Sequence, residues 1–119
     1  IGSLVNAKAV ASKSVQLATD HIDVVMAGVK GEITLEDFLA AGEILYWICE
    51  SLEEYEVNDF AKAAINANRD DESLKEGFYN SRSGKRLAKI GYEKDIEYCI
   101  QKNITNNVAI YKNGNIVLL

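Results

Sequence analysis

The sequence predicts a helix-rich α/β protein in which helices pack on a parallel or mixed sheet and the chain ends in a short hairpin. The first observation is a β-branched apolar run over residues 22–26, followed by a glycine loop at residues 28–31 and a helix that opens at Thr34. This order of strand, glycine loop and helix is typical of sites in α/β proteins. The second observation is helical spacing of apolar residues over most of the chain. The third is Asn113-Gly114 between two apolar segments, which predicts the hairpin.

Composition limits the number of domains and the kinds of partner. With 119 residues, 48% of them hydrophobic, the chain is expected to form one domain over residues 1–119. The 13 Lys and Arg against 18 Asp and Glu leave a net charge of −5, so neither nucleic acid nor an anionic membrane is an expected partner. No apolar run approaches the roughly 18 residues of a membrane span, and no signal peptide is recognisable. We therefore expect a cytoplasmic protein.

The expected elements follow from apolar rows and their caps. The first helix covers about residues 4–19, capped by Ser3 or Asn6, and its buried row of small residues suits packing against a sheet. The second covers about residues 34–52 and is apolar on two rows, which places it at the centre of the fold. The remaining elements are helices near residues 57–67, 72–79, 85–90 and 93–102, a break at residues 68–71, and hairpin strands at residues 108–111 and 116–119.

Helix geometry separates two acids in the first turn of the Thr34 helix. Glu36 belongs to a stripe with Glu43 and Glu50 that recurs every seven residues and is expected to face solvent. Asp37 heads an apolar row and is expected to face the body of the protein. A carboxylate in that position needs a partner, which can be a cap N–H, a cation or a metal.

Two interpretations of Asp37 stay open at this point. In the structural one, Thr34 is the helix cap and Asp37 reaches back to complete a capping box. In the functional one, the glycine loop and the unpaired N–H groups of the new helix form a ligand site. An EF-hand calcium loop is excluded, because its ligand positions 1, 3 and 5 would be Met26, Gly28 and Lys30.

Other polar positions have structural interpretations. Cys49 and Cys99 are expected to be reduced core thiols. His21 follows the first helix, where a positive charge suits the C-terminal end of the helix dipole. Residues 81–86 gather hydroxyls and cations at a helix start, and we expect a solvated loop with capping serines, with an anion site as the alternative. Gly42, inside the second helix, is expected at a close backbone contact, since glycine there costs about 1 kcal/mol relative to Ala.

Three segments, in order along the chain, carry a resemblance to a known family. They are Ser3-Leu4-Val5-Asn6-Ala7, residues 31–42 with their Leu-Glu-Asp-Phe-Leu-Ala-Ala-Gly core, and Ser83-Gly84-Lys85-Arg86-Leu87 with its continuation to Gln101. Together they resemble the later half of the 2-phosphosulfolactate phosphatase family and cover nearly the whole chain. The chain also begins at Ile1-Gly2-Ser3, without an initiator Met or a polar leader. We therefore expect it to be the later part of a longer protein.

The resemblance implies a magnesium-dependent α/β phosphatase that removes phosphate from 2-phospho-3-sulfolactate, a step toward coenzyme M. On this basis Asp37 and Glu36 are the expected catalytic residues and would hold Mg²⁺ directly or through water. The family's Asp-bearing strand and Thr-Asn-Gly-Thr phosphate loop belong to its earlier half and do not occur here. Because phosphoryl transfer needs those groups, we expect the isolated chain to be inactive. The expected substrate-binding residues are Ser3, Asn6, Gly28 and Thr34.

The resemblance also bears on the expected binding partners, and the chain differs from the family at a few positions. The resemblance implies a small phosphate ester as ligand, and we expect the chain to form a homo-oligomer or to associate with the missing N-terminal half. The chain differs from the family at Met26, where members carry Cys, and at Val108-Ala109, where they carry Val-Pro. The alternative function is a catalytically silent α/β interaction module, in which the capping box and the serine loop are only structural.

Overall fold

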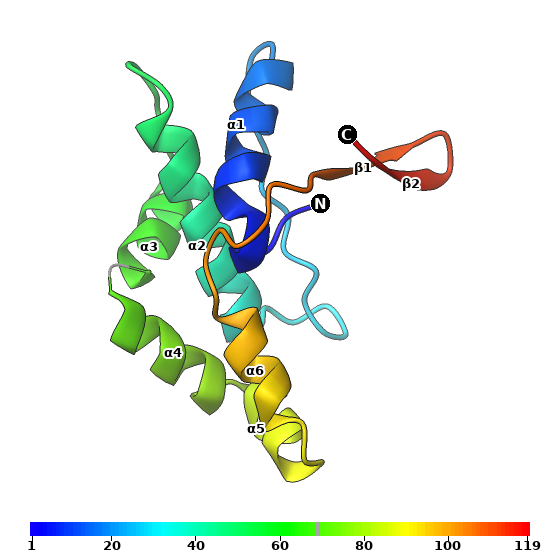
Figure 1. Ribbon diagram of the computed structural model, residues 1–119. Coiled ribbons are helices and arrows are strands. Elements are labelled where there is room, and N and C mark those ends of the chain that lie inside the picture. Colours follow the sequence, from blue (N-terminus) through cyan, green and yellow to red (C-terminus); the bar gives the residue numbers. More distant parts are fainter. Residues whose placement is uncertain (69) are drawn as a thin grey trace.

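A computed structural model describes residues 1–68 and 70–119, and it shows a helical body from which a small hairpin projects (Figure 1). The predicted helix-rich α/β class and the terminal hairpin are confirmed. Within the described residues, the sheet contains only the antiparallel strands β1 and β2. In chain order the elements are the 3₁₀ helix η1 (Leu4–Asn6), then α1 (Ala7–Leu17), α2 (Leu35–Glu50), α3 (Asp59–Ala67), α4 (Asp71–Asn80), α5 (Arg82–Lys89), α6 (Glu93–Cys99), β1 (Ala109–Lys112) and β2 (Asn115–Leu118).

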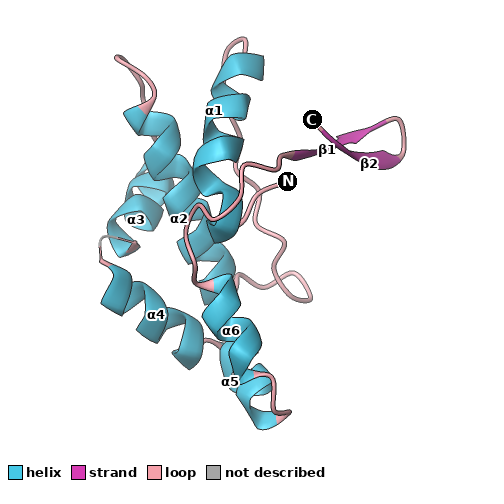
Figure 2. Ribbon diagram, in the orientation of Figure 1, coloured by secondary structure: helices cyan, strands magenta, loops and turns pink. Residues whose placement is uncertain are grey.

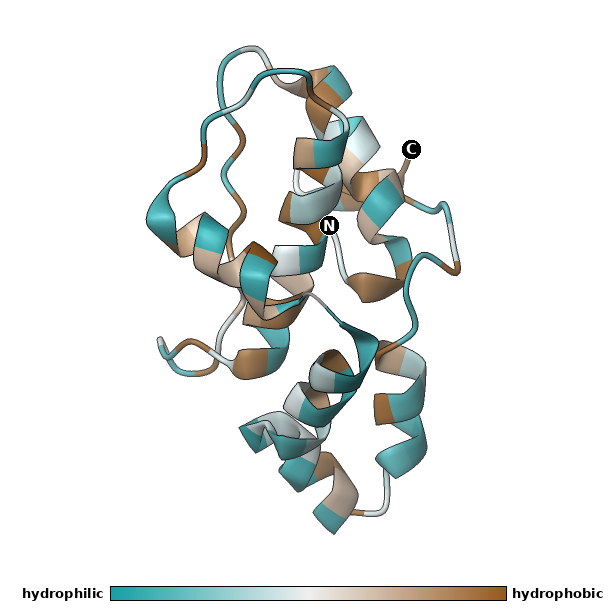
Figure 3. Cartoon of the chain, turned by 90° about the vertical axis from the view of Figure 1, so that its left-hand side faces the viewer, coloured by the Kyte–Doolittle hydropathy of each residue, from teal (hydrophilic) through white to brown (hydrophobic). Residues whose placement is uncertain are grey.

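Helix α2 lies at the centre of the body, as its two apolar rows predicted. It contacts α1, α3 and α4 and also the short helix η1 (Figure 1). Its residues Leu39, Ile44 and Ile48 are all buried. Hydrophilic and hydrophobic positions alternate around the helices, so that each presents a polar side as well as an apolar one (Figure 3).

The contact between α2 and α3 depends on Gly42. A Cβ atom at this position would lie 2.1 Å from the carbonyl oxygen of Ala64 in α3. No side chain fits in that space, so the cost of glycine in a helix is offset by the close packing of two backbones. The close backbone contact predicted at Gly42 is confirmed.

Helix α1 packs on α2 and not on a sheet, which corrects the sequence expectation. Its small residues Ala7 and Ala11 are fully buried in a core cluster that includes Ile44 and Ile48 of α2. Small side chains suit the close approach of two helices as well as they suit a sheet, and for this reason the composition of the row did not distinguish the two cases.

The segment at residues 22–26 has no regular secondary structure, although a strand was predicted there (Figure 2). Its side chains alternate between half-buried and exposed. No main-chain hydrogen bond joins residues 19–27 to any other described residue. The parallel pairing expected for this run is therefore not formed within the described part of the chain.

Smaller differences concern the ends of helices and one thiol. Helix α3 begins at Asp59 because the Asn58 side chain accepts a hydrogen bond from the N–H of Ala61 at 2.8 Å. Cys49 is buried as expected, but Cys99 at the end of α6 is exposed and is not a core residue. The predicted break at residues 68–71 separates α3 from α4, with Arg69 itself outside the described residues.

Among the described helices, we find none with the length and hydrophobicity of a membrane span.

Candidate functional site

The start of α2 carries two of the predicted site residues, Glu36 and Asp37. Thr34 occupies the N-cap position with extended backbone, at φ −111° and ψ 146°. The first N–H groups of a helix have no partner within it, and the helix dipole is positive at this end. This position therefore favours negatively charged groups.

Asp37 holds the glycine loop and does not bond back to the helix cap. Its Oδ2 accepts a hydrogen bond from the N–H of Gly28 at 2.7 Å. Gly28 has a φ of +64°, and a Cβ atom there would lie 2.6 Å from the carbonyl oxygen of Glu32, so only glycine fits this turn. The capping-box interpretation of Asp37 is wrong, because the carboxylate bonds to the loop instead.

The rest of the glycine loop is tied to itself and to α5. Val29 and Glu32 exchange main-chain hydrogen bonds of 3.0 and 3.1 Å across the turn. The Glu32 carboxylate lies 2.8 Å from the Arg82 guanidinium at the start of α5. The loop is therefore anchored at both ends, by Asp37 on one side and by Arg82 on the other.

A cavity of about 240 Å³ lies beside the start of α2. Three predicted site residues, Ser3, Glu36 and Asp37, contribute polar groups to its wall. Phe78 of α4 and Tyr98 of α6 contribute aromatic rings to the same wall. The structure thus brings residues from the start and from the second half of the chain around one small polar and apolar pocket.

Two polar atoms near the start of α2 are buried and have no hydrogen-bond partner among the described residues. They are Oγ1 of Thr34, a residue that is only 6% exposed, and Oε2 of Glu36. Buried polar groups in native proteins are nearly always paired, so an unpaired one calls for an ion, a water or a ligand. Glu36 is half-buried on the cavity wall, which corrects the expectation that it faces solvent.

Asn6, also predicted to bind substrate, holds the chain ends together. Its Nδ2 donates to the carbonyl oxygens of Asn107 at 2.9 Å and of Ile1 at 3.3 Å. Its Oδ1 accepts from the N–H of Ser3 at 2.9 Å. The amide group therefore positions Ser3, which lines the cavity, while Asn6 itself is not one of the lining residues.

Two carboxylates at the cavity are of the ligand type that a hard divalent cation takes. Mg²⁺ is commonly bound through one or two carboxylates, with phosphate oxygens and waters as the other ligands. Glu36 and Asp37 provide two carboxylates, and the Oε2 of Glu36 lacks any described partner. Among the described residues there is no group of three or more His, Cys, Asp or Glu side chains that could hold a metal. The remaining ligands of such an ion would be oxygens of substrate, water or another polypeptide segment.

Ser81 is a capping serine, as expected, but residues 82–86 belong to α5 and do not form the expected solvated loop. Ser81 caps α5, since its Oγ accepts from the N–H of Gly84 at 2.9 Å. The same hydroxyl donates to the carbonyl oxygen of Phe78 at 2.8 Å. The Ser81 hydroxyl therefore both donates and accepts a hydrogen bond within the protein, and it links the end of α4 to the start of α5.

A buried polar cluster around Glu43 was not predicted. Glu43 is 4% exposed and accepts a hydrogen bond from Trp47 Nε1 at 2.8 Å and another from Asn68 Nδ2. The ammonium group of Lys102 lies 3.0 Å from Glu43 and 2.9 Å from Asp71. The expectation that Glu43 faces solvent is wrong, because Asn68 and Lys102 cover it from distant parts of the chain. Leu39 and Trp47, four residues before and after Glu43 on the same helix face, were the available signal.

Lys102 is the cation of this cluster and its charge is held in place. Burial lowers the pKa of the Lys102 ammonium, but hydrogen bonds to Asp71 and Glu43, together with their negative charges, outweigh burial and raise it. The cluster therefore keeps Lys102 charged at neutral pH. It joins α2, α4 and the segment after α6.

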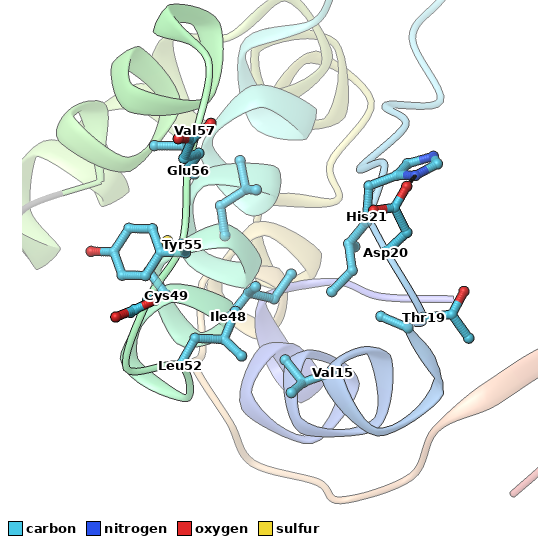
Figure 4. A pocket seen from close by; sticks show the side chains of 14 residues that line it. Val15, Thr19, Asp20, His21, Ile48, Cys49, Leu52, Tyr55, Glu56 and Val57 are labelled. Atoms are coloured by element: carbon cyan, nitrogen blue, oxygen red, sulfur yellow. Dashed lines mark hydrogen bonds and ion pairs between the residues drawn. The ribbon is translucent and has the colours of Figure 1, made fainter.

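A second cavity, of about 550 Å³, lies at the opposite end of α2 and contains none of the predicted site residues. Figure 4 shows His21 and Asp20 on one side of it, and Tyr55 and Glu56 on the other, with Val15 among the apolar side chains between. His21 pairs with Asp20 at 3.3 Å, and both side chains are exposed. It does not cap α1, which ends four residues earlier at Leu17.

Comparison with known proteins shows which family the chain belongs to. A family model described as 2-phosphosulpholactate phosphatase matches residues 1–114. The chain belongs to this family. The family resemblance predicted from three short segments is confirmed, and it extends over almost all of the chain.

Curated relatives in the 2-phosphosulfolactate phosphatase family are longer than this chain. The 2-phosphosulfolactate phosphatase of Methanothermobacter thermautotrophicus is 42% identical over 119 residues, which are 100% of this chain and 50% of the relative. A probable 2-phosphosulfolactate phosphatase of Clostridium acetobutylicum is 35% identical over 117 residues, 98% of this chain and 49% of the relative. A probable 2-phosphosulfolactate phosphatase of Clostridium tetani is 37% identical over 117 residues, 96% and 48% respectively. The chain spans about half the length of the curated relatives that it matches.

Proposed function

We propose that this chain forms one half of a cytoplasmic, magnesium-dependent phosphatase that hydrolyses 2-phospho-3-sulfolactate, a step toward coenzyme M. The observation that carries the proposal is the cavity at the start of α2, where Glu36 and Asp37 share one wall. Family membership supports the substrate class, since the curated relatives carry that activity in their names.

The residues at the cavity suit the recognition of a doubly anionic ester. The unpaired N–H groups at the start of α2 would donate to oxygens of the phosphate or the sulfonate. The Thr34 hydroxyl is buried at the same helix end but outside the cavity lining, and its lack of a described partner supports it as a further donor. Ser3 on the cavity wall would add a further donor. The magnesium ion held by Glu36 and Asp37 would neutralise charge on the phosphate oxygens. Gly28 would keep Asp37 in place through its main-chain hydrogen bond.

The isolated chain is expected to be inactive. Phosphoryl transfer depends on positioning an in-line nucleophile and on neutralising charge around the transferred group. Two carboxylates and a few donors supply part of this arrangement, but the Asp-bearing strand and the phosphate loop expected for the family are absent from these 119 residues. A family-length protein would bring those groups to the cavity.

The experiment is an assay of a family-length chimera, in which the remaining half of the Methanothermobacter thermautotrophicus relative is joined to this chain. We expect phosphate release from 2-phospho-3-sulfolactate that depends on Mg²⁺, while the isolated chain stays well below a typical kcat of about 10 s⁻¹. In the chimera, Asp37→Asn should weaken magnesium dependence or activity by about 10- to 100-fold. Glu50→Gln, at an exposed acid on the far end of α2, is the matched control and should leave both unchanged.

Each contrary result has a definite meaning. Activity that needs no metal, or Asp37→Asn with unchanged magnesium affinity and turnover, would overturn the magnesium role. Turnover by the isolated chain near that of the chimera would place the whole catalytic set within these residues. A folded chimera without phosphatase activity would instead favour the non-catalytic interaction module.

A further inference from the structure

Residues 22–26 have the side-chain arrangement of a β-strand but no neighbouring strand. Ile22 and Val24 are half-buried and pack against the core cluster of α1 and α2, while Asp23 and Val25 between and after them are exposed. Such alternation is the signature of a strand with one face on a core. The main-chain groups of residues 19–27 make no hydrogen bond with other described residues. A run of this kind presents an open edge for another strand.

The outer side of this segment carries the large apolar side chain of Val25 next to the charged Asp23. Val25 is 87% exposed, more than any other large hydrophobic side chain among the described residues. Strands buried on both faces within a sheet carry apolar residues on both sides, whereas strands that face water carry polar ones. Val25 is therefore the kind of residue that an inner strand carries, although the structure leaves it uncovered and Asp23 shares its side.

The hairpin presents a second uncovered apolar face. In its register Tyr111 pairs with Ile116 and Ala109 with Leu118, so that these four residues share one face. Tyr111, Ile116 and Leu118 are between 65% and 73% exposed. On the other face Ile110 packs against the same α1 and α2 core cluster as the segment at residues 22–26. The hairpin projects from the helical body with nothing against its outer side (Figure 1).

We propose that residues 22–26 are one strand of a sheet that is completed by a β-strand from the remaining half of the family-length protein. This chain makes up 50% of the Methanothermobacter relative's length, so a polypeptide of equal length remains to supply that strand. The incoming strand pairs with the open main-chain groups of residues 22–26 and buries Val25. The same half covers Tyr111, Ile116 and Leu118 of the hairpin.

This docking places the incoming half at the candidate site. Residues 22–26 lead directly into the loop whose Gly28 N–H bonds to Asp37. Ligands of α/β proteins bind just beyond the carboxyl ends of sheet strands. A strand that pairs with residues 22–26 therefore lies next to the loop, Asp37 and the cavity at the start of α2. The inference rests on the proposed function only in that both require a protein about twice as long as this chain.

Hydrogen exchange tests the pairing without reference to activity. The family-length chimera and the isolated chain are compared by mass spectrometry, residue by residue over residues 19–30. At concentrations where the isolated chain is monomeric, its amides at residues 22–26 should exchange freely, and in the monomeric chimera they should exchange at least about 100-fold more slowly. Unchanged exchange in a folded chimera would overturn the proposal. Protection that appears only in concentration-dependent dimers would overturn it in favour of a second copy of this chain.

A pair of matched variants tests the same surface by stability. Val25→Asp and Ile90→Asp each put a charge on an apolar side chain that is exposed in the isolated chain, by 87% and 59% respectively. Both should leave the melting temperature of the isolated chain unchanged, and only Val25→Asp should lower that of the chimera and remove the amide protection. Equal effects of Val25→Asp on the chain and the chimera would rule out an interface here. An unmutated chimera that protects these amides but has no phosphatase activity would count against the proposed function alone.

Discussion

The Oδ2 atom of Asp37 accepts a hydrogen bond from the N–H of Gly28 at 2.7 Å, and this bond joins the start of the central helix to the loop nine residues earlier. The loop reaches this position only because Gly28 adopts a φ of +64°. A carboxylate that anchors a loop and lines a cavity combines a structural and a candidate catalytic role. The two roles can be measured separately.

Asp37→Ala removes the acceptor and leaves a half-buried N–H without a partner, so it should lower the free energy of unfolding of the isolated chain by about 1 to 3 kcal/mol. Asp37→Asn keeps an acceptor oxygen and should cost about 1 kcal/mol. Urea unfolding gives the energies, and exchange of the Gly28 amide reports the loop. Glu36→Gln is the control, since its buried Oε2 has no described partner to lose. Equal losses for Asp37→Ala and Glu36→Gln would contradict the anchoring role.

Gly42→Ala should destabilise the protein by about 1 to 3 kcal/mol, because the new methyl group meets the Ala64 carbonyl and two backbones must separate. Gly77→Ala in α4 is the matched control. Its Cβ would meet only side-chain atoms of Leu39 and Leu35 and no backbone atom, while alanine favours the helix by about 1 kcal/mol. Thermal unfolding of both variants checks the contrast. The explanation fails if Gly77→Ala is as damaging as Gly42→Ala.

The Lys102 cluster should give a pH-dependent contribution to stability. Because the folded-state pKa of Lys102 is raised above its ordinary value of 10.5, the stabilisation is complete below that value and is lost as pH rises through the folded-state pKa. The difference in unfolding free energy between the protein and its Lys102→Met variant should therefore be constant at neutral pH and shrink in alkali. Lys62→Met, which breaks an exposed pair with Asp59, serves as control and should show little difference at any pH. A Lys102 difference that does not change with pH would contradict the assignment.

The two cysteines should differ in their reaction with a thiol reagent such as dithiobisnitrobenzoate. Cys99 is exposed and should react in the folded chain, whereas buried Cys49 should react only on unfolding. Burial raises the pKa of both thiols, and Asp95 adds to the effect at Cys99, so the fast reaction should accelerate as pH rises toward and beyond 9. Cys99→Ser should remove the fast phase. Two equally fast thiols would show that Cys49 is not protected.

The isolated chain is expected to self-associate, since the outer face of the hairpin and the open edge at residues 22–26 lack a partner. Sedimentation should show a dimer or a larger species at micromolar concentration. Ile116→Lys, which places a charge in the middle of the uncovered hairpin face, should shift the equilibrium toward monomer. A clean monomer whose amides at residues 22–26 are already protected would describe a self-sufficient domain.

Local patterns were enough to predict the helices and part of their packing. The two apolar rows of residues 34–52 identified the central helix, because burial on several sides leaves its mark in the period of 3.6 residues. Gly42 marked the close contact with α3, since only an interaction outside the helix compensates a glycine inside it. The Asn113-Gly114 pair likewise located the hairpin, because these two residue types tolerate the positive φ that the tight turn requires and that both adopt here.

The partners of polar side chains were decided only by the tertiary structure. Whether Asp37 bonded to Thr34 or to Gly28 depended on the path of the loop, and Glu43 became buried because Asn68 and Lys102 reach it from distant segments. The sequence by itself determined the family, the order of helices and the apolar faces, since these depend on spacing along the chain. The pairing of residues 22–26 and the environment of each carboxylate depend on contacts between segments far apart in sequence, and no local period encodes which segments those are.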